Sequence, residues 1–130
     1  VGYKKEILEK IVSEQYKNRC KLEFITTEFE KPPGNSIKTA MKSCFEKKLL
    51  IILGDTLIDN NLIELVDNGK NCVLTSQEFG ETRNWCVITK KDSIIDEILD
   101  KKELRKDEKY HALVGCYFFN DIDLLKNVLD

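Results

Sequence analysis

The chain has 130 residues, of which 42% are hydrophobic and 34% charged, and its 21 basic and 23 acidic residues give a formal net charge of −2. This length predicts a single domain with a modest core. The near-neutral charge argues against nucleic acid or an anionic membrane as a general partner, so any phosphate site must be local. No apolar run approaches the ~20 residues of a membrane span, which indicates a soluble protein.

The cysteines indicate where the protein works. An odd number, without a CxxC pair and partly within apolar runs, is typical of free thiols that pack as small hydrophobes. We therefore expect a reducing, cytoplasmic location. The cysteines are Cys20, Cys44, Cys72, Cys86 and Cys116.

The first third of the chain predicts two helices around a strand and a loop. Apolar residues recur every three or four positions over residues 3–18, which is typical of an amphipathic helix. Residues 21–26 are predicted to form a short strand. The prolines and glycine in residues 26–35 predict a loop, and Ser36 is a suitable N-cap for a helix through residue 48.

The stretch around which we expect the fold to be organised follows. Residues 49–53 are five consecutive aliphatic side chains, which predict a strand buried on both faces, as in a parallel sheet. Gly54 allows a sharp turn, and Asp55 then lies at the C-terminal edge of the sheet, where open α/β folds bind ligands. The same residues also form an ordinary turn, with Asp59 or Asn60 capping the next helix, and spacing alone favours that interpretation.

The rest of the chain predicts further alternation and then a hairpin. The predicted elements are a helix over 60–68 closed by Gly69, a strand over 71–76, a hairpin of 85–89 and 94–99, a solvated charge run over 100–109, a strand over 111–119 with Gly115 inside it, and a helix capped by Asn120 or Asp121 and ending at 129. The order predicts an α/β fold of Rossmann-like, three-layer α/β/α type, with a mixed, mainly parallel sheet.

Several motifs occur in a specific order. They are Val1-Gly2-Tyr3 before a Lys/Glu-rich helix, Gly34-Asn35-Ser36, Leu53-Gly54-Asp55-Thr56, Trp85-Cys86-Val87, Asp100-Lys101, and the segment from Ala112 to Phe119. In this order they resemble the nucleotidyltransferases that activate sugar 1-phosphates, together with the related phosphocholine cytidylyltransferases. The resemblance implies that residues 1–130 are the central part of one nucleotidyltransferase domain, which begins mid-domain and is incomplete at the N-terminal side of its sheet.

The resemblance implies a reaction. A phosphate oxygen of the acceptor attacks the α-phosphorus of a nucleoside triphosphate, and pyrophosphate leaves. Because both substrates are polyanions, catalysis is mainly positioning and charge neutralisation by Mg²⁺ and lysine. Asp55 matches the family's metal-binding aspartate, and Lys101 corresponds loosely to its acceptor-phosphate lysine. Nucleic acid and membranes are not expected as partners.

The resemblance also implies the substrate-binding residues. Gly34 and Asn35 are expected to lie on the nucleobase side, where a Cβ at residue 34 would collide with the ring. Gly54 and Thr56 order the turn that carries Asp55. Trp85 and Gly115 are expected near the acceptor, although Gly115 is also explained as a bulge. His111, the single histidine, is predicted to have no catalytic role.

The sequence departs from the family pattern in two places. Cys86 stands where a glycine usually follows the aromatic residue, which leaves the acceptor open. The glycine-rich loop that cradles the triphosphate is missing from the 130 residues. We therefore expect the isolated chain to be inactive, and a non-catalytic regulatory or scaffolding subunit of the same fold stays open, as does a generic Rossmann-like domain. A missing strand would also leave a sheet edge at which a second copy could pair.

Overall fold

The computed structural model describes residues 3–28, 32–59, 61–78, 80–104 and 108–129. The chain divides into two compact units, which are described separately. One comprises Val1–Glu46 with Asp123–Asp130, and the other Lys47–Ile122. In the described part of the chain, no helix is long and apolar enough to cross a membrane.

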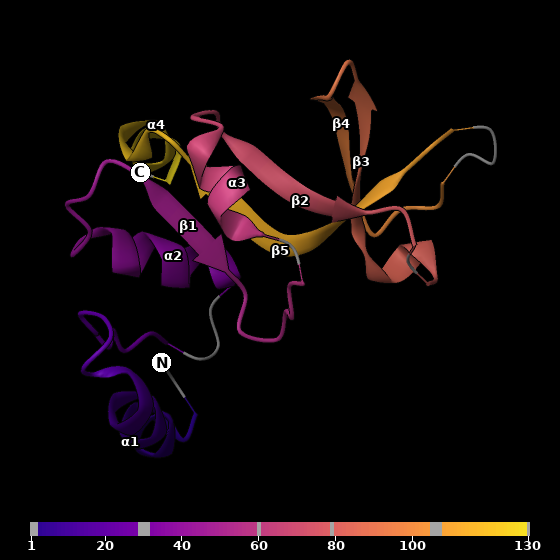
Figure 1. Ribbon diagram of the computed structural model, residues 1–130. Coiled ribbons are helices and arrows are strands. Elements are labelled where there is room, and N and C mark those ends of the chain that lie inside the picture. Colours follow the sequence, from indigo (N-terminus) through magenta and orange to yellow (C-terminus); the bar gives the residue numbers. More distant parts are fainter. Residues whose placement is uncertain (1–2, 29–31, 60, 79, 105–107, 130) are drawn as a thin grey trace. The chain divides into compact units, whose positions relative to one another are not determined.

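The first unit contains helices α1 (Lys5–Tyr16) and α2 (Pro33–Met41) and most of α4 (Ile122–Leu129) (Figure 1). The predicted N-terminal helix is confirmed, although it is shorter than residues 3–18. Its apolar face is not covered, because no residue of α1 is buried and Ile7 and Leu8 are 56% and 47% exposed.

Two predictions for the segment before α2 are wrong. Residues 21–28 form no strand, because alternating apolar residues do not by themselves supply a neighbouring strand to pair with. The predicted loop ends sooner than expected, since α2 begins at Pro33 rather than after Ser36. Proline is well suited to the first helical position, where its missing N–H would have no partner in the helix. Residues 29–31 lie outside the described residues.

The second unit is built on a five-stranded sheet (Figure 1). Its strands are β1 (Leu49–Ile52), β2 (Cys72–Ser76), β3 (Cys86–Lys91), β4 (Ile94–Asp100) and β5 (His111–Phe119), with α3 (Leu62–Asp67) and the short 3₁₀ helix η1 (Thr82–Asn84) between them. The sheet order is β1-β5-β3-β4, and β2 also pairs with β5. The register shows how β5 holds three partners. Phe118 lies opposite both Leu50 and Cys72, and Ala112 opposite both Val87 and Ser76. Since a strand has two edges, β1 and β3 share one edge of β5 and β2 takes the other.

The α/β class is confirmed, but the mainly parallel sheet is not. Every pairing between described strands is antiparallel. Because β1 and β2 both run opposite to β5, they run in the same direction, as the β1-α3-β2 order predicts. The strand that separates them, β5, comes from much later in the sequence, and the local pattern could not predict its insertion.

The core of the second unit lies on β3 and β5 rather than on β1. The buried hydrophobic residues of this unit are Val87, Ile88, Ala112, Cys116, Phe118 and Ile122. The prediction that residues 49–53 form a strand buried on both faces is therefore wrong, since Ile52 and Leu53 are 43% and 39% exposed. A run of aliphatic residues shows that a strand forms, but its burial depends on its neighbours.

The local predictions for α3 and the hairpin are largely confirmed. Asn61, rather than Asp59, caps α3 by accepting a 3.1 Å hydrogen bond from the backbone N–H of Ile63, and Asn60 lies outside the described residues. Gly69 follows the helix with a φ of 67°, as expected for a C-terminal glycine. Strands β3 and β4 form the predicted hairpin, and its turn residues Asp92 and Ser93 both have positive φ, which suits a tight two-residue connection.

Candidate functional site

The turn after β1 presents Asp55 to solvent and is fastened to β5 at both ends. The backbone N–H of Leu53 donates to the carbonyl of Gly115 at 2.9 Å, and the Thr56 hydroxyl donates to the carbonyl of Val114 at 3.0 Å. Within the turn, the N–H of Thr56 donates to the carbonyl of Leu53 at 3.1 Å. The exposed Asp55 carboxylate is thus held on an ordered backbone next to the middle of β5.

Gly115 makes this close approach of the two segments possible. A Cβ at this position would lie 2.8 Å from both Leu53 Cδ1 and Thr56 Oγ1, and the φ of 79° is one that other residues rarely adopt. The strand also bulges here, because Val73 lies opposite Tyr117 whereas Thr75 lies opposite Leu113. Bulges of this kind often occur next to functional sites, where they change the direction of a strand.

Trp85 and Lys101 are brought together at the open end of the hairpin. Trp85 directly precedes β3 and is 36% exposed, and Lys101 directly follows β4. The backbone N–H of Lys101 donates to the carbonyl of Trp85 at 3.1 Å, and Lys101 has a φ of 51°. The backbone of Lys101, the residue that loosely matches the family's lysine, is therefore fixed by this hydrogen bond to Trp85.

The pairing of β3 with β5 ends before the part of β5 that holds the Asp55 turn. Val87 lies opposite Ala112 and Ile88 opposite His111. The structure thus defines two separate groups, one at the Asp55 turn beside Val114 and Gly115, and one at the open end of the hairpin.

Gly34 and Asn35 belong to the first unit, at the start of α2. Among the described residues, apart from the chain neighbours and the backbone of α2 itself, no atom lies within 4 Å of the position where a Cβ of residue 34 would stand, so a flat ligand could approach here. The carbonyl of Asn35 accepts a 2.8 Å hydrogen bond from the Thr39 hydroxyl one turn later in the helix.

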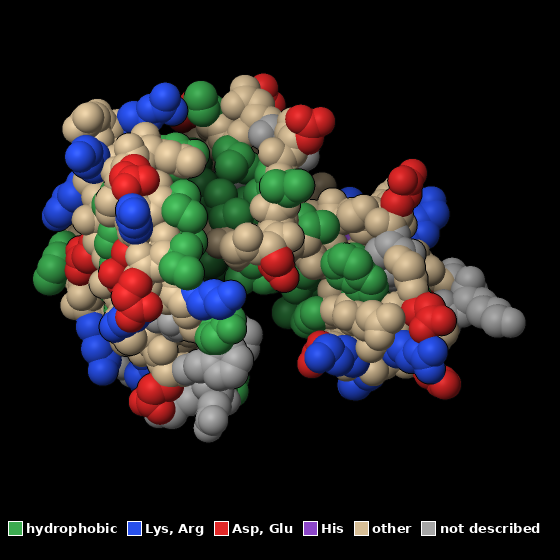
Figure 2. Space-filling model, turned by 90° about the horizontal axis from the view of Figure 1, so that it is seen from below, with side chains coloured by type: hydrophobic (Ala, Val, Ile, Leu, Met, Phe, Trp, Pro, Cys, Tyr) green, Lys and Arg blue, Asp and Glu red, His purple; other side chains and the backbone are tan. Residues whose placement is uncertain are grey.

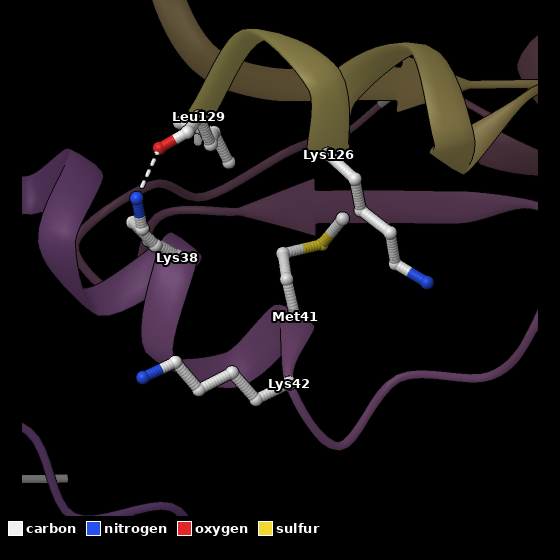
Figure 3. Close-up of a pocket in the computed structure, with 5 residues that line it drawn as sticks. All are labelled: Lys38, Met41, Lys42, Lys126 and Leu129. Atoms are coloured by element: carbon white, nitrogen blue, oxygen red, sulfur yellow. Dashed lines mark hydrogen bonds between the residues drawn. The ribbon is translucent and has the colours of Figure 1, made fainter.

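A pocket of about 270 Å³ lies between α2 and α4, and sequence reasoning did not identify it (Figure 3). Its lining residues are Lys38, Met41, Lys42, Lys126 and Leu129. The Lys38 ammonium donates to the Leu129 carbonyl at 2.6 Å, and the Lys126 ammonium donates to the Cys44 carbonyl at 3.2 Å. Figure 3 shows the Lys38 and Lys126 ammonium groups pointing in different directions rather than toward one point. These lysines connect the two helices, and a lysine at a helix C-terminus is favourable in any protein.

The titratable groups near the sheet are not activated for nucleophilic chemistry. Burial raises the pKa of Cys86, with a further contribution from Asp100, and burial also raises the pKa of Cys116. The pKa of Tyr117 is raised by burial and then by these two thiols. His111 is buried, and its pKa is lowered by burial and then by Lys90 and Lys109. No histidine is visible on the face shown in Figure 2, where basic and acidic side chains are interspersed.

The described residues provide one carboxylate for a metal rather than a complete set of ligands. No cluster of three or more His, Cys, Asp or Glu suited to a metal ion occurs among them. Magnesium, however, commonly binds through one or two carboxylates and completes its shell with water and substrate phosphates. The exposed Asp55 fits that type of site and does not fit a site made by protein ligands alone.

Comparisons with known proteins identify the fold. No family model matches the sequence, and no curated protein matches it either. A crystal structure from Bacillus anthracis, assigned as a glucose-1-phosphate thymidylyltransferase and solved in complex with sucrose, is similar with a TM-score of 0.75 and 16% sequence identity. The similarity covers 96% of this chain and 51% of the other, so the chain spans about half the length of that structure. The chain thus has a nucleotidyltransferase-like fold.

Proposed function

We propose that these residues form the central part of a nucleotidyltransferase, which transfers a nucleoside monophosphate from a nucleoside triphosphate to a sugar 1-phosphate or phosphocholine-like acceptor. A phosphate oxygen of the acceptor attacks the α-phosphorus of the triphosphate, and the bond to the departing pyrophosphate breaks. The product would supply precursors of cell-surface polysaccharide.

The observation that carries this proposal is the position of the Asp55 turn. A turn fastened to β5 by Thr56, and fitted against Gly115, holds a carboxylate at the C-terminal end of β1 within a nucleotidyltransferase-like fold. In α/β proteins such strand ends are where ligands bind. An ordinary turn would need neither the hydrogen bond from Thr56 to β5 nor the close packing against Gly115.

Each candidate residue has a role in this scheme. Bound Mg²⁺ would neutralise the phosphates, and Asp55 would supply its protein ligand. Lys101 would attract the acceptor phosphate, with its backbone held by the carbonyl of Trp85. Gly115 and Trp85 would border the acceptor, and the open backbone at Gly34 would receive the nucleobase. Positioning and charge neutralisation are the main contributions that an enzyme makes to phosphoryl transfer.

A non-catalytic subunit of the same fold is the second candidate. The observation that favours it is Cys86, which stands where a glycine usually follows the aromatic residue in the family that the sequence resembles. A subunit that binds nucleotide and regulates a partner would tolerate this change.

The experiment is a pyrophosphate-release assay on the full-length product of the gene that encodes these residues. CTP, UTP, dTTP and GTP would each be tested with sugar 1-phosphates and phosphocholine. The enzyme proposal predicts turnover with one combination and its loss in Asp55→Asn. Nucleotide binding without turnover would favour the regulatory subunit. Turnover that survives Asp55→Asn would contradict the role of Asp55.

A further inference from the structure

The two faces of the β3–β4 hairpin differ in chemistry. Residues directly opposite one another on paired strands share a face of the sheet. The register pairs Cys86 with Asp100, Ile88 with Ile98, and Lys90 with Ile95, and alternation along β3 places these three pairs on one face. Its exposed residues, Lys90, Ile95, Ile98 and Asp100, are hereafter called the isoleucine face, whereas Ile88 is buried in the core of the unit.

The isoleucine face has apolar surface that this chain does not cover. Ile98 is 59% exposed and Ile95 is 41% exposed, and they lie on either side of the irregularity at which the β3–β4 register shifts between Thr89 and Lys90. Toward the tip of the hairpin the same face borders a groove of about 670 Å³, whose other side includes Val73 and Thr75 of β2. Exposed apolar surface next to a groove is typical of an interaction site.

The charges at the two ends of this face are opposite in sign. Asp100 lies at the open end of the hairpin, Lys90 lies near its tip, and both side chains are exposed. Between them lie the exposed isoleucines. A surface with an acid at one end, apolar residues in the middle and a base at the other end is complementary to itself when one copy is turned around.

We propose that the isoleucine face is an interface with a second copy of this chain. In a twofold arrangement, two hairpins stack face to face and antiparallel, so that the isoleucines of both copies pack together. Lys90 of each copy then lies opposite Asp100 of the other, so the tip of each hairpin lies over the open end of its partner's hairpin. A twofold axis makes both contacts identical.

The free edge of β4 is a less suitable site for a second copy. Two β4 strands pairing edge to edge around their centre would bring Asp96 and Glu97 of the copies together, and like charges directly opposite one another are destabilising. A second copy is therefore expected to bind the isoleucine face rather than the free edge of β4.

Sedimentation velocity of the 130-residue chain, from the low micromolar to the millimolar range, tests the proposal. The wild type is expected to shift from monomer to dimer as its concentration rises. Ile98→Asp should remain monomeric throughout, and because residue 98 is exposed, this variant should still fold by circular dichroism. Lys90→Asp should weaken the dimer about tenfold, because both symmetric charge pairs become repulsive.

Two further variants complete the design. Lys90→Asp combined with Asp100→Lys should restore the dimer, because the pairs form again with their signs exchanged. Lys91→Asp makes the same charge change on the opposite face of the hairpin and should leave the dimer unchanged. A wild type that stays monomeric at every concentration overturns the proposal, as does a dimer that Lys90→Asp and Lys91→Asp weaken equally.

Discussion

The side-chain hydroxyl of Thr56 donates a 3.0 Å hydrogen bond to the carbonyl of Val114, and a Cβ on the adjacent Gly115 would lie 2.8 Å from that hydroxyl oxygen. Two segments almost sixty residues apart in sequence are thereby fitted to one another. Thr56 orders the Asp55 turn by donating this hydrogen bond to β5. Its hydroxyl proton is therefore not directed at a substrate.

Replacing Gly115 by alanine should destabilise the protein strongly. The new methyl group would press against Leu53 and Thr56, and the positive φ would be strained, which together correspond to about 2–4 kcal/mol. Denaturant unfolding measures the change. Gly34→Ala is the matched control, because its Cβ would meet no described atom within 4 Å other than those of its chain neighbours and its own helix, and it should stay within about 1 kcal/mol of wild type. Equal effects of the two substitutions would disprove the fit at Gly115.

Thr56→Val should cost about 1 kcal/mol, since the side chain keeps its shape while the Val114 carbonyl loses its donor. Thr56→Ser keeps the hydroxyl and should preserve the hydrogen bond. Chemical unfolding of the three proteins under identical conditions gives the comparison. A valine variant as stable as wild type would show that the bond contributes nothing to the turn.

Stability should fall on mild acidification, partly because of His111. Burial, then Lys90 and Lys109, hold the pKa of His111 below its usual 6.5, so the unfolded chain takes up a proton that the folded chain resists. Stability from this source is complete above about pH 6.5 and decreases as the pH falls below that value. His111→Gln should flatten this part of a plot of melting temperature against pH. An unchanged slope would exclude the histidine as its cause.

The thiols should differ in reactivity. Cys20 is exposed, whereas burial raises the pKa of Cys72, Cys86 and Cys116, so those thiols stay protonated and poorly nucleophilic. A chromogenic disulfide reagent should therefore label Cys20 first in the native protein. In Cys20→Ser the fast phase should disappear, and its persistence would mean that another thiol is accessible.

The sequence predicted where the strands and helices lie along the chain better than it predicted which strands pair with one another. β5 was predicted with the bounds that the structure shows, because residues 111–119 are mostly apolar and give a strong local signal. The insertion of β5 between β1 and β2 depends on contacts far apart in sequence and could not be inferred from local alternation. The start of α2 was missed because two adjacent prolines were taken to exclude a helix, whereas Pro33 occupies the one helical position that suits it.

The site was predicted in the same partial way. The Asp55 turn follows directly from a strand and a glycine. Gly115 was predicted to form a bulge or to let the acceptor approach, and the structure shows the bulge together with a close approach of Leu53 and Thr56. The hydrogen bond from Lys101 to Trp85 closes the hairpin that the sequence predicted. The hydrogen bond from Thr56 to Val114 could not be predicted, because it joins segments whose proximity the sequence did not reveal.

The most direct test of the central claim is an NMR titration of the full-length product of the gene that encodes these residues, with Mg²⁺ and each nucleoside triphosphate, followed at the backbone amides. The account predicts Mg²⁺-dependent shifts at Asp55, Thr56 and Gly115 for one preferred base. These shifts should be lost in Asp55→Asn and kept in Asp59→Asn, which removes an equally exposed carboxylate four residues away. Shifts that are absent with every nucleotide, or that survive Asp55→Asn, would contradict the assignment of this turn as the nucleotide and metal site.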